Sequence, residues 1–207
     1  MKVKQFTTEP LEVNCYVCSS YGEAIVIDPG GSGRDILQFI VDEQLLIRAV
    51  VNTHGHGDHI MGNGFLMEAT DAKLVIHEAD AAILTDPQRN LSSFMGREVT
   101  GPGADRYVSD GDAIAFGRSS VNVWHTPGHT PGSICLVGEG LVFSGDTLFA
   151  GSHGRTDLPG GDESQMQKSL ERLAQLPEDT VVYPGHGSSS TIGKERRSNP
   201  YVQEVLT

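Results

Sequence analysis

The chain has 207 residues, a length typical of one domain with a sizeable buried core. Its 15 Lys and Arg residues against 27 Asp and Glu residues give a formal net charge of -12, which disfavours nucleic acids and anionic membranes as partners. Hydrophobic residues make up 38% and charged residues 20% of the chain, as in a globular protein rather than a disordered one. The chain has 8 His but only 3 Cys and 1 Trp, and histidine is the commonest metal ligand.

The first ten residues lack the apolar core of a signal peptide, and no apolar run approaches the ~20 residues that span a bilayer. The cysteines form no closed disulfide framework, because their number is odd. Cys15 and Cys18 lie in the alternating segment 13–18, which places residues three apart on opposite faces of a strand. We therefore expect buried thiols rather than a zinc knuckle, in a cytoplasmic protein.

Strand-like apolar runs recur along the chain, at residues 24–28, 48–52, 73–77, 121–125, 133–137, 141–144 and 180–183. Helical patterns lie between several of these runs. Ser32 is the expected N-cap of a first helix, whose apolar stripe consists of Ile36, Leu37, Ile40 and Val41. The alternation of strands and helices predicts the α/β class.

A second helix is expected after Asp162, which resembles a capping box together with Gln165. Its apolar residues recur at helical spacing, at Met166, Leu170 and Leu173. No repeat or low-complexity linker divides the chain, so we expect one domain over residues 1–207. Residues 85–110 break the alternation with glycines and prolines among apolar residues, and they are the predicted flap beside an active site.

Four ligand-type side chains stand within six positions directly after the run 48–52. His54 and His56 are two apart in extended chain and project from the same face, where they can hold one ion. The glycines beside them let the loop curl, so that Asp58 and His59 approach the same place. A solvated polar loop does not need this order of residues, so the pattern indicates a metal site.

Three further motifs place a histidine or an aspartate where a strand ends. His129 lies in a turn that two Pro-Gly pairs fix, Asp146 follows the run 141–144, and His186 stands between two glycines after the run 180–183. Strand ends that present His or Asp on tight turns are what a metal cleft at one edge of a sheet requires.

The motifs T-H-x-H-x-D-H, P-G-H-T, S-G-D-T and P-G-H-G, in this order, are similar to the signature of the metallo-β-lactamase-fold superfamily. The chain resembles the compact bacterial glyoxalase II-like hydrolases of that superfamily over nearly its whole length, through residues 145–151, residues 154–157 and the short segment 184–200. The resemblance implies an αββα sandwich, with two packed sheets, helices outside and metals at one end.

The resemblance also implies two divalent metal ions per chain. The implied ligands are His54, His56 and His129 for the first ion, Asp58, His59 and His186 for the second, and Asp146 as a bridge between them. Imidazoles and carboxylates without a thiolate suit zinc, which we expect, and also iron or manganese. In typical zinc β-lactamases of this superfamily a cysteine holds the second metal, and no cysteine here lies in a ligand motif, which argues against antibiotic hydrolysis.

Metal coordination lowers the pKa of water to about 7, so we expect a metal-bound hydroxide to attack the carbonyl of a thioester. Asp58 is the expected catalytic residue, because it can orient this nucleophile or take its proton. A thiolate leaving group needs little acid help. The expected substrate is a small anionic thioester, most simply a glutathione thioester such as S-lactoylglutathione.

Four residues are candidate substrate contacts. Arg155 stands where related enzymes place a basic glutathione contact, and His153 precedes it in the same loop. Lys194 and Arg197 belong to a basic cluster in an otherwise acidic chain. The alternatives are a solvated helix face for this cluster and a water-facing loop position for His153.

Other functions remain open for the same residues. In a persulfide dioxygenase of similar scaffold, a single iron is held by residues that correspond to His54, His129 and Asp146, and oxygen is consumed. A lactone hydrolase would use the same machinery. A nuclease is disfavoured by the net charge of -12, and a binding module without catalysis does not need a complete ligand set.

Overall fold

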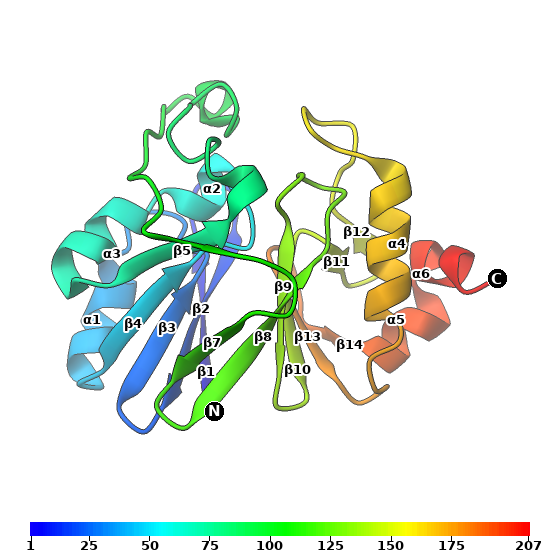
Figure 1. Ribbon diagram of the computed structural model, residues 1–207, viewed down its shortest axis with the longest axis horizontal. Helices are drawn as coiled ribbons and strands as arrows, with labels where there is room; N and C mark the ends of the chain where they lie inside the picture. The colour runs from blue at the N-terminus through cyan, green and yellow to red at the C-terminus, as the bar shows by residue number, and fades with distance from the viewer.

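Two six-stranded sheets lie between two layers of helices in the computed structural model, which describes residues 1–207 (Figure 1). Helices α1 and α3 cover the outer face of one sheet, and α4, α5 and α6 cover the outer face of the other (Figure 1). The predicted α/β class and αββα sandwich are confirmed.

The first sheet follows the order of the chain from edge to edge. Its strands are β1 (Lys2–Thr8), β2 (Val13–Ser20), β3 (Glu23–Ile27), β4 (Leu46–Val51), β5 (Lys73–His77) and β6 (Arg106–Val108). The first three strands are antiparallel, and β3 to β6 are parallel. The parallel strands read as continuous apolar runs because both faces of the sheet are covered.

The second sheet has the order β14-β13-β10-β9-β8-β7. Its strands are β7 (Ala113–Phe116), β8 (Ser119–His125), β9 (Ile134–Gly138), β10 (Leu141–Gly145), β13 (Val181–Pro184) and β14 (Ser190–Thr191). All neighbours are antiparallel except β10 and β13. A separate two-stranded ribbon consists of β11 (Leu148–Phe149) and β12 (Ser152–His153).

The helices and short 3-10 turns connect these strands. They are α1 (Arg34–Asp42), α2 (Gly57–Ile60), α3 (Asn63–Thr70), η1 (Glu78–Asp80), η2 (Ser92–Met95), α4 (Glu163–Leu173), α5 (Ile192–Ser198) and α6 (Pro200–Val205). No helix in the structure has the length and apolar composition needed to cross a membrane.

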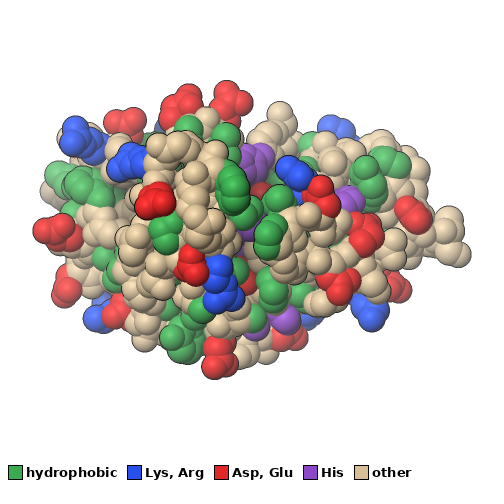
Figure 2. Space-filling view, turned by 90° about the horizontal axis from the view of Figure 1, so that it is seen from above, with side chains coloured by type: hydrophobic (Ala, Val, Ile, Leu, Met, Phe, Trp, Pro, Cys, Tyr) green, Lys and Arg blue, Asp and Glu red, His purple; other side chains and the backbone are tan.

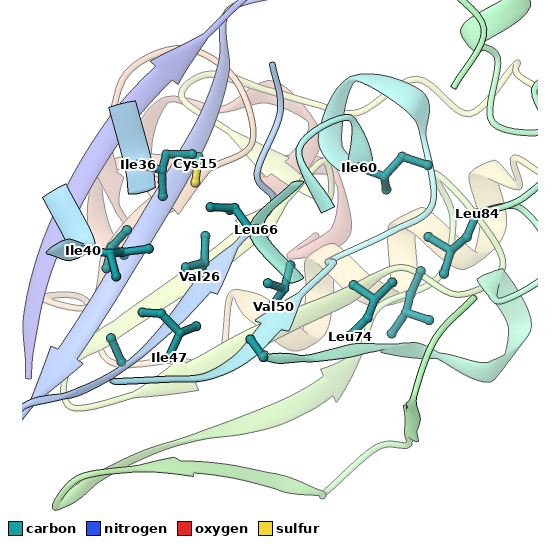
Figure 3. Close-up of a cluster of buried hydrophobic side chains, with 14 of the residues drawn as sticks. Cys15, Val26, Ile36, Ile40, Ile47, Val50, Ile60, Leu66, Leu74 and Leu84 are labelled. Atoms are coloured by element: carbon teal, nitrogen blue, oxygen red, sulfur yellow. The ribbon is translucent and has the colours of Figure 1, made fainter. Parts of the chain in front are cut away.

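Three layers of buried apolar side chains hold the sandwich together. One layer joins α1 and α3 to the first sheet, and Figure 3 shows Ile36, Leu66 and Val50 among its side chains. A second lies between the two sheets, and a third lies between the second sheet and α4 to α6. Cys15 belongs to the first layer and Cys18 to the second. The prediction that these two thiols are buried on opposite faces of one strand is confirmed, and neither is in a disulfide.

The start of the first helix differs from the prediction. Gly33, in the left-handed conformation with φ of 72°, is the N-cap of α1, and no side chain caps the helix. Ile36 and Ile40 are buried as expected, but Val41 is 62% exposed. The predicted cap of α4 is confirmed, because the Asp162 side chain accepts a hydrogen bond from the Gln165 N–H.

The predicted flap, residues 85–110, is only partly loop. Its last part forms β6, a parallel neighbour of β5 and hence part of the first sheet. Its first part is anchored to the start of α2, because the N–H of Gly57 donates to the carbonyl of Asn90 at 2.7 Å. Asn90 and Ser92 are fully buried, so much of this segment is packed rather than free.

Candidate metal centre

The ligand motifs come off the ends of strands that belong to both sheets. The loop 54–59 follows β4 in the first sheet, whereas the motifs of His129, Asp146 and His186 follow β8, β10 and β13 in the second. Figure 2 views the molecule from the end at which these loops lie, and histidine side chains show near the middle of this face (Figure 2). The structure brings all seven predicted ligands together there.

A first group of donors consists of His54, His56 and His129. One ring nitrogen from each lies within 4.8 Å of the other two. Nδ1 of His56 is 2.9 Å from Nε2 of His129. All three side chains are buried. This group presents only imidazole nitrogens.

A second group consists of Asp58, His59 and His186, and its donor atoms also lie within 4.8 Å of one another. Nε2 of His59 is 3.3 Å from Nε2 of His186. Oδ2 of Asp58 is 3.4 Å from Nε2 of His186 and 3.8 Å from Nε2 of His59. This group therefore combines two imidazoles with one carboxylate.

Asp146 lies between the two groups. Its Oδ1 is 3.4 Å from Nε2 of His59. Its Oδ2 is 3.6 Å from Nε2 of His129 and 3.6 Å from Nε2 of His186. The carboxylate thus contacts donors of both groups, as a bridging ligand requires.

The outer nitrogens of the rings are held by acceptors, which fixes the direction of the inner nitrogens. Nδ1 of His129 is 2.7 Å from the carbonyl oxygen of Arg155, and Nδ1 of His186 is 3.0 Å from that of Leu11. Nδ1 of His59 is 3.0 Å from Oδ2 of Asp28. Protons on these outer atoms leave the Nε2 lone pairs directed into the cluster, which is the arrangement of ligating histidines.

Two buried atoms in the cluster have no hydrogen-bond partner, Nε2 of His54 and Oδ1 of Asp146. A buried polar atom without a partner costs roughly 1–3 kcal/mol. A cation held by both groups would satisfy each of these atoms, and neutral imidazoles with carboxylates are donors that zinc, iron and manganese accept. The residues present therefore fit divalent metal ions.

The electrostatics of the cluster also favour a cation. Burial and the neighbouring imidazoles lower the pKa of His54, and burial with His129 lowers the pKa of His56 to about 3. Both rings are therefore neutral, as ligands must be. Burial also acts to lower the pKa of His59, but nearby carboxylates, Asp146 foremost, raise it to about 10. The carboxylates around His59 therefore stabilise a positive charge at this place in the cluster.

Sequence reasoning did not find Asp28, whose carboxylate is 1% exposed behind the cluster. It accepts hydrogen bonds from the N–H of Thr53 at 2.7 Å and from its hydroxyl at 2.6 Å, besides the contact with His59. Asp28 ends the predicted strand 24–28 and stands directly before Pro29 and Gly30, so it could have been predicted as a strand-end aspartate like Asp146.

The four predicted substrate contacts separate into two pairs. Arg155 lies next to the cluster, since its backbone carbonyl binds His129, and His153 stands two residues before it in β12. The Arg155 side chain is 67% exposed and forms two hydrogen bonds with Asp157, at 2.8 and 2.9 Å. The ring of His153 packs edge-on against Tyr201, with 4.2 Å between centroids.

Lys194 and Arg197 are not brought to the cluster. Both lie on α5, which follows β14, and β14 pairs with the start of β13 at Val181. The cluster lies beyond the other end of β13, where His186 follows. Arg197 instead lies 3.5 Å from Glu178. The alternative of a solvated helix face therefore describes these two residues better than the predicted substrate contact.

A cavity of about 550 Å³ lies on the first-sheet side of the molecule, and none of the seven predicted ligands lines it. The β1–β2 turn, the start of α1, Met61 and the flap line it, and it includes the guanidinium groups of Arg34 and Arg97, neither of which has an ion-pair partner. Next to it, the carbonyl of Leu11 binds His186. Volumes of this size accommodate small ligands. The sequence motifs gave no indication of this cavity.

The model of the metallo-beta-lactamase superfamily matches residues 8–186. An uncharacterized protein of Aquifex aeolicus is 41% identical, with 100% of this chain and 99% of that protein covered. The probable metallo-hydrolase YqgX of Bacillus subtilis is 35% identical, with 98% of each chain covered. Hydroxyacylglutathione hydrolase GloC of Haemophilus influenzae is 30% identical, with 98% of each covered.

Solved structures are also similar. The BLEG-1 B3 metallo-beta-lactamase is 36% identical at a TM-score of 0.93, with 97% of this chain and 99% of that chain covered. TTHA1623, in a di-iron-bound form, is 35% identical at a TM-score of 0.88, with coverage of 96% and 100%. ETHE1 from Myxococcus xanthus is 30% identical at a TM-score of 0.83, with coverage of 100% and 91%.

Proposed function

The chain belongs to the metallo-β-lactamase superfamily, and from that premise we propose that it is a dinuclear metal-dependent hydrolase of thioesters. The observation that carries the proposal is the pair of donor groups with Asp146 between them. The proposed substrate is a small anionic thioester, with S-lactoylglutathione as its representative. The net charge of -12 supports a small molecule rather than a nucleic acid.

In this proposal His54, His56 and His129 hold one divalent ion, Asp58, His59 and His186 hold the other, and Asp146 contacts both. Zinc is the proposed metal, and the likeness to a di-iron form of TTHA1623 makes iron the principal alternative. Bound divalent ions supply a water of lowered pKa and a Lewis acid for the carbonyl oxygen. The hydrolysis forms a carbon–oxygen bond, breaks the carbon–sulfur bond, and leaves a carboxylate and a thiol.

Asp58 is the proposed catalytic residue. Its side chain is only 11% exposed, at the mouth of the second group. Burial acts to raise the pKa of Asp58, but the charge of His59 and the hydrogen bond with His186 hold it below its ordinary range. The carboxylate is therefore ionised at neutral pH, so Oδ2 can orient the attacking water and accept its proton.

The proposed contact for the anionic end of the substrate is Arg155. Its backbone carbonyl binds His129, so the residue is fixed at the edge of the metal cluster. Asp157 binds one edge of the guanidinium, through Nε and Nη2, which leaves Nη1 for a substrate carboxylate. The proposed location is cytoplasmic. The three buried cysteines, none of them in a disulfide, support this location.

Two other activities are alternatives. A single-iron persulfide dioxygenase is one, because His54, His129 and Asp146, which would hold the iron, lie together in the cluster. The likeness to BLEG-1 favours β-lactam hydrolysis. A lactone hydrolase remains a further alternative, because the same site can attack a cyclic ester.

Metal content and substrate preference together test the proposal. Protein purified without added metal is analysed for zinc, iron and manganese, and is then assayed with S-lactoylglutathione, a lactone, a β-lactam and glutathione persulfide. We expect two ions per chain and thiol release from S-lactoylglutathione, with loss of this release in His56→Ala. One iron per chain with oxygen uptake on glutathione persulfide would refute the hydrolase assignment.

A further inference from the structure

Asp80 is a buried carboxylate that belongs to neither donor group. It ends the short 3-10 turn η1 (Glu78–Asp80), directly after β5. It is fully buried, with 0% of the residue exposed. A buried carboxylate is costly unless its oxygens are hydrogen-bonded, so its partners indicate its role.

Those partners lie on two separate loops of the metal cluster. Oδ2 accepts the N–H of Gly55 at 2.9 Å and the hydroxyl of Thr130 at 2.7 Å. Oδ1 accepts the N–H of Gly132 at 2.7 Å. Gly55 lies between His54 and His56, and Thr130 follows His129. One side chain therefore joins the loop with two ligands of the first group to the turn with the third.

Both glycines permit this close approach. A Cβ added at Gly132 would lie 2.6 Å from the Asp80 carboxylate, and one added at Gly55 would lie 2.9 Å from Ile83. A side chain at position 132 would therefore displace the Asp80 carboxylate, and one at position 55 would displace Ile83. The turn is held from a second side as well, because Nε2 of His125 is 2.9 Å from the carbonyl of Pro131.

We propose that Asp80 is the positioning residue for the first donor group: it sets the separation between the loop of His54 and His56 and the turn of His129, so that their nitrogens are arranged before an ion binds. The proposal rests on the proposed metal centre. The second group is positioned independently of Asp80, because Asp28 holds His59 and the carbonyl of Leu11 holds His186.

The substitution Asp80→Asn tests this role while nearly keeping the shape of the side chain. An amide has one acceptor oxygen, and its NH₂ group faces at least one of the three donors now bound. At least one of the two loops therefore loses one of its hydrogen bonds to residue 80. Loss of a hydrogen bond that orients metal ligands costs about 10- to 100-fold in metal affinity.

The experiment measures zinc binding to metal-free protein by competition with a chromophoric chelator, without any assay of turnover. For Asp80→Asn we expect one of the two ions to bind about 10- to 100-fold more weakly, and the other to bind as in the unaltered protein. Asp105→Asn is the matched control. Its carboxylate accepts the N–H of Leu74 and pairs with Lys73, but contacts neither ligand loop.

The outcomes separate the positioning role from general destabilisation. Equal weakening of both ions, or affinities equal to those of Asp105→Asn, would overturn the role of Asp80. If Asp80→Asn does not fold, Thr130→Val takes its place, because it removes one of the three hydrogen bonds to Asp80. Weaker binding of one ion alone would support the proposal. Unchanged binding of both ions would overturn it. An unaltered protein that binds no ion would instead refute the proposed metal centre itself.

Discussion

Oδ2 of Asp28 lies 3.0 Å from Nδ1 of His59, and the same carboxylate accepts two hydrogen bonds from Thr53. With its outer nitrogen bound in this way, His59 presents Nε2 to His186. The hydroxyl of Thr53 in turn lies 3.1 Å from Nδ1 of His54. One buried carboxylate therefore orients a ring in each of the two donor groups.

This relationship predicts that Asp28→Asn weakens the binding of both ions, in contrast to Asp80→Asn. The amide has a single acceptor oxygen, so its NH₂ group faces either the Thr53 N–H or the Thr53 hydroxyl together with His59. Either arrangement weakens the support that both groups share, at a cost of about 10- to 100-fold in affinity. Zinc titration of metal-free protein measures the effect. Asp42→Asn, on the outer surface of α1, is the control. Loss of a single ion would contradict the double role.

Removal of metal is expected to lower the thermal stability. Ions that bind only the folded state stabilise it by about 4 kcal/mol when present at 1,000 times Kd. In a chain of this size about 1 kcal/mol corresponds to 2–4 °C in Tm, so we expect chelation to lower Tm by about 10 °C. Scanning calorimetry with and without a chelator measures the shift, which zinc should reverse. A Tm that does not respond to chelator would contradict a metal centre built from these residues.

The gathering of the seven predicted ligands could be predicted from sequence because their motifs follow recognisable strands, and strands fix where their ends meet. The loop of His54 follows β4, and the motif of His186 follows β13, and the packing of the two sheets brings them together. The opposite burial of Cys15 and Cys18 follows equally from the two-residue period of a strand.

The supporting residues could not be predicted in this way. Asp80 is 25 residues from Gly55 and 50 from Thr130 along the chain, and nothing in its local sequence indicates either contact. Arg197 looked like a substrate contact because of its charge, but its pairing with Glu178 depends on how α5 packs. Such partners are set by tertiary packing rather than by spacing.

The edge strand β1 (Lys2–Thr8) also escaped prediction. It alternates charged or polar residues with half-buried ones and pairs with β2 alone. Charged side chains such as Lys2 and Lys4 are common on edge strands, where they discourage pairing with other chains. The same charges weaken the apolar pattern by which strands are recognised.

Alkaline pH is expected to destabilise the fold through the buried thiols. Burial raises the pKa of Cys135 from 9.0 to about 11. Below pH 9 the thiol is protonated in both folded and unfolded chains and has no effect. Between pH 9 and 11 only the unfolded chain ionises, so stability falls by up to about 1.4 kcal/mol per pH unit. Urea unfolding at pH 8 and pH 10 measures this loss, which should be smaller in Cys135→Ala. Equal losses in both proteins would contradict it.

The same burial predicts that the cysteines do not react in the folded protein. All three thiols have 0% exposure, and burial raises the pKa of Cys15 and Cys18 as well. Because the thiolate is the nucleophile, iodoacetamide should modify none of them at pH 8 without denaturant and all of them in urea. Mass spectrometry counts the adducts, and rapid labelling of the native protein would contradict the packing described for β2 and β9.

Arg155→Ala is expected to raise KM for S-lactoylglutathione about 10-fold while leaving kcat nearly unchanged, because a charge-assisted hydrogen bond to a substrate carboxylate contributes about 1.5–3 kcal/mol to binding. The backbone carbonyl that holds His129 remains in this variant, so the ligand is not disturbed. Arg197→Ala is the matched control, since it removes an equal charge from α5, where Arg197 pairs with Glu178. It should leave both constants unchanged. An equal rise in KM in the two variants would indicate a long-range effect of net charge, and no rise in Arg155→Ala would remove this residue from the substrate site.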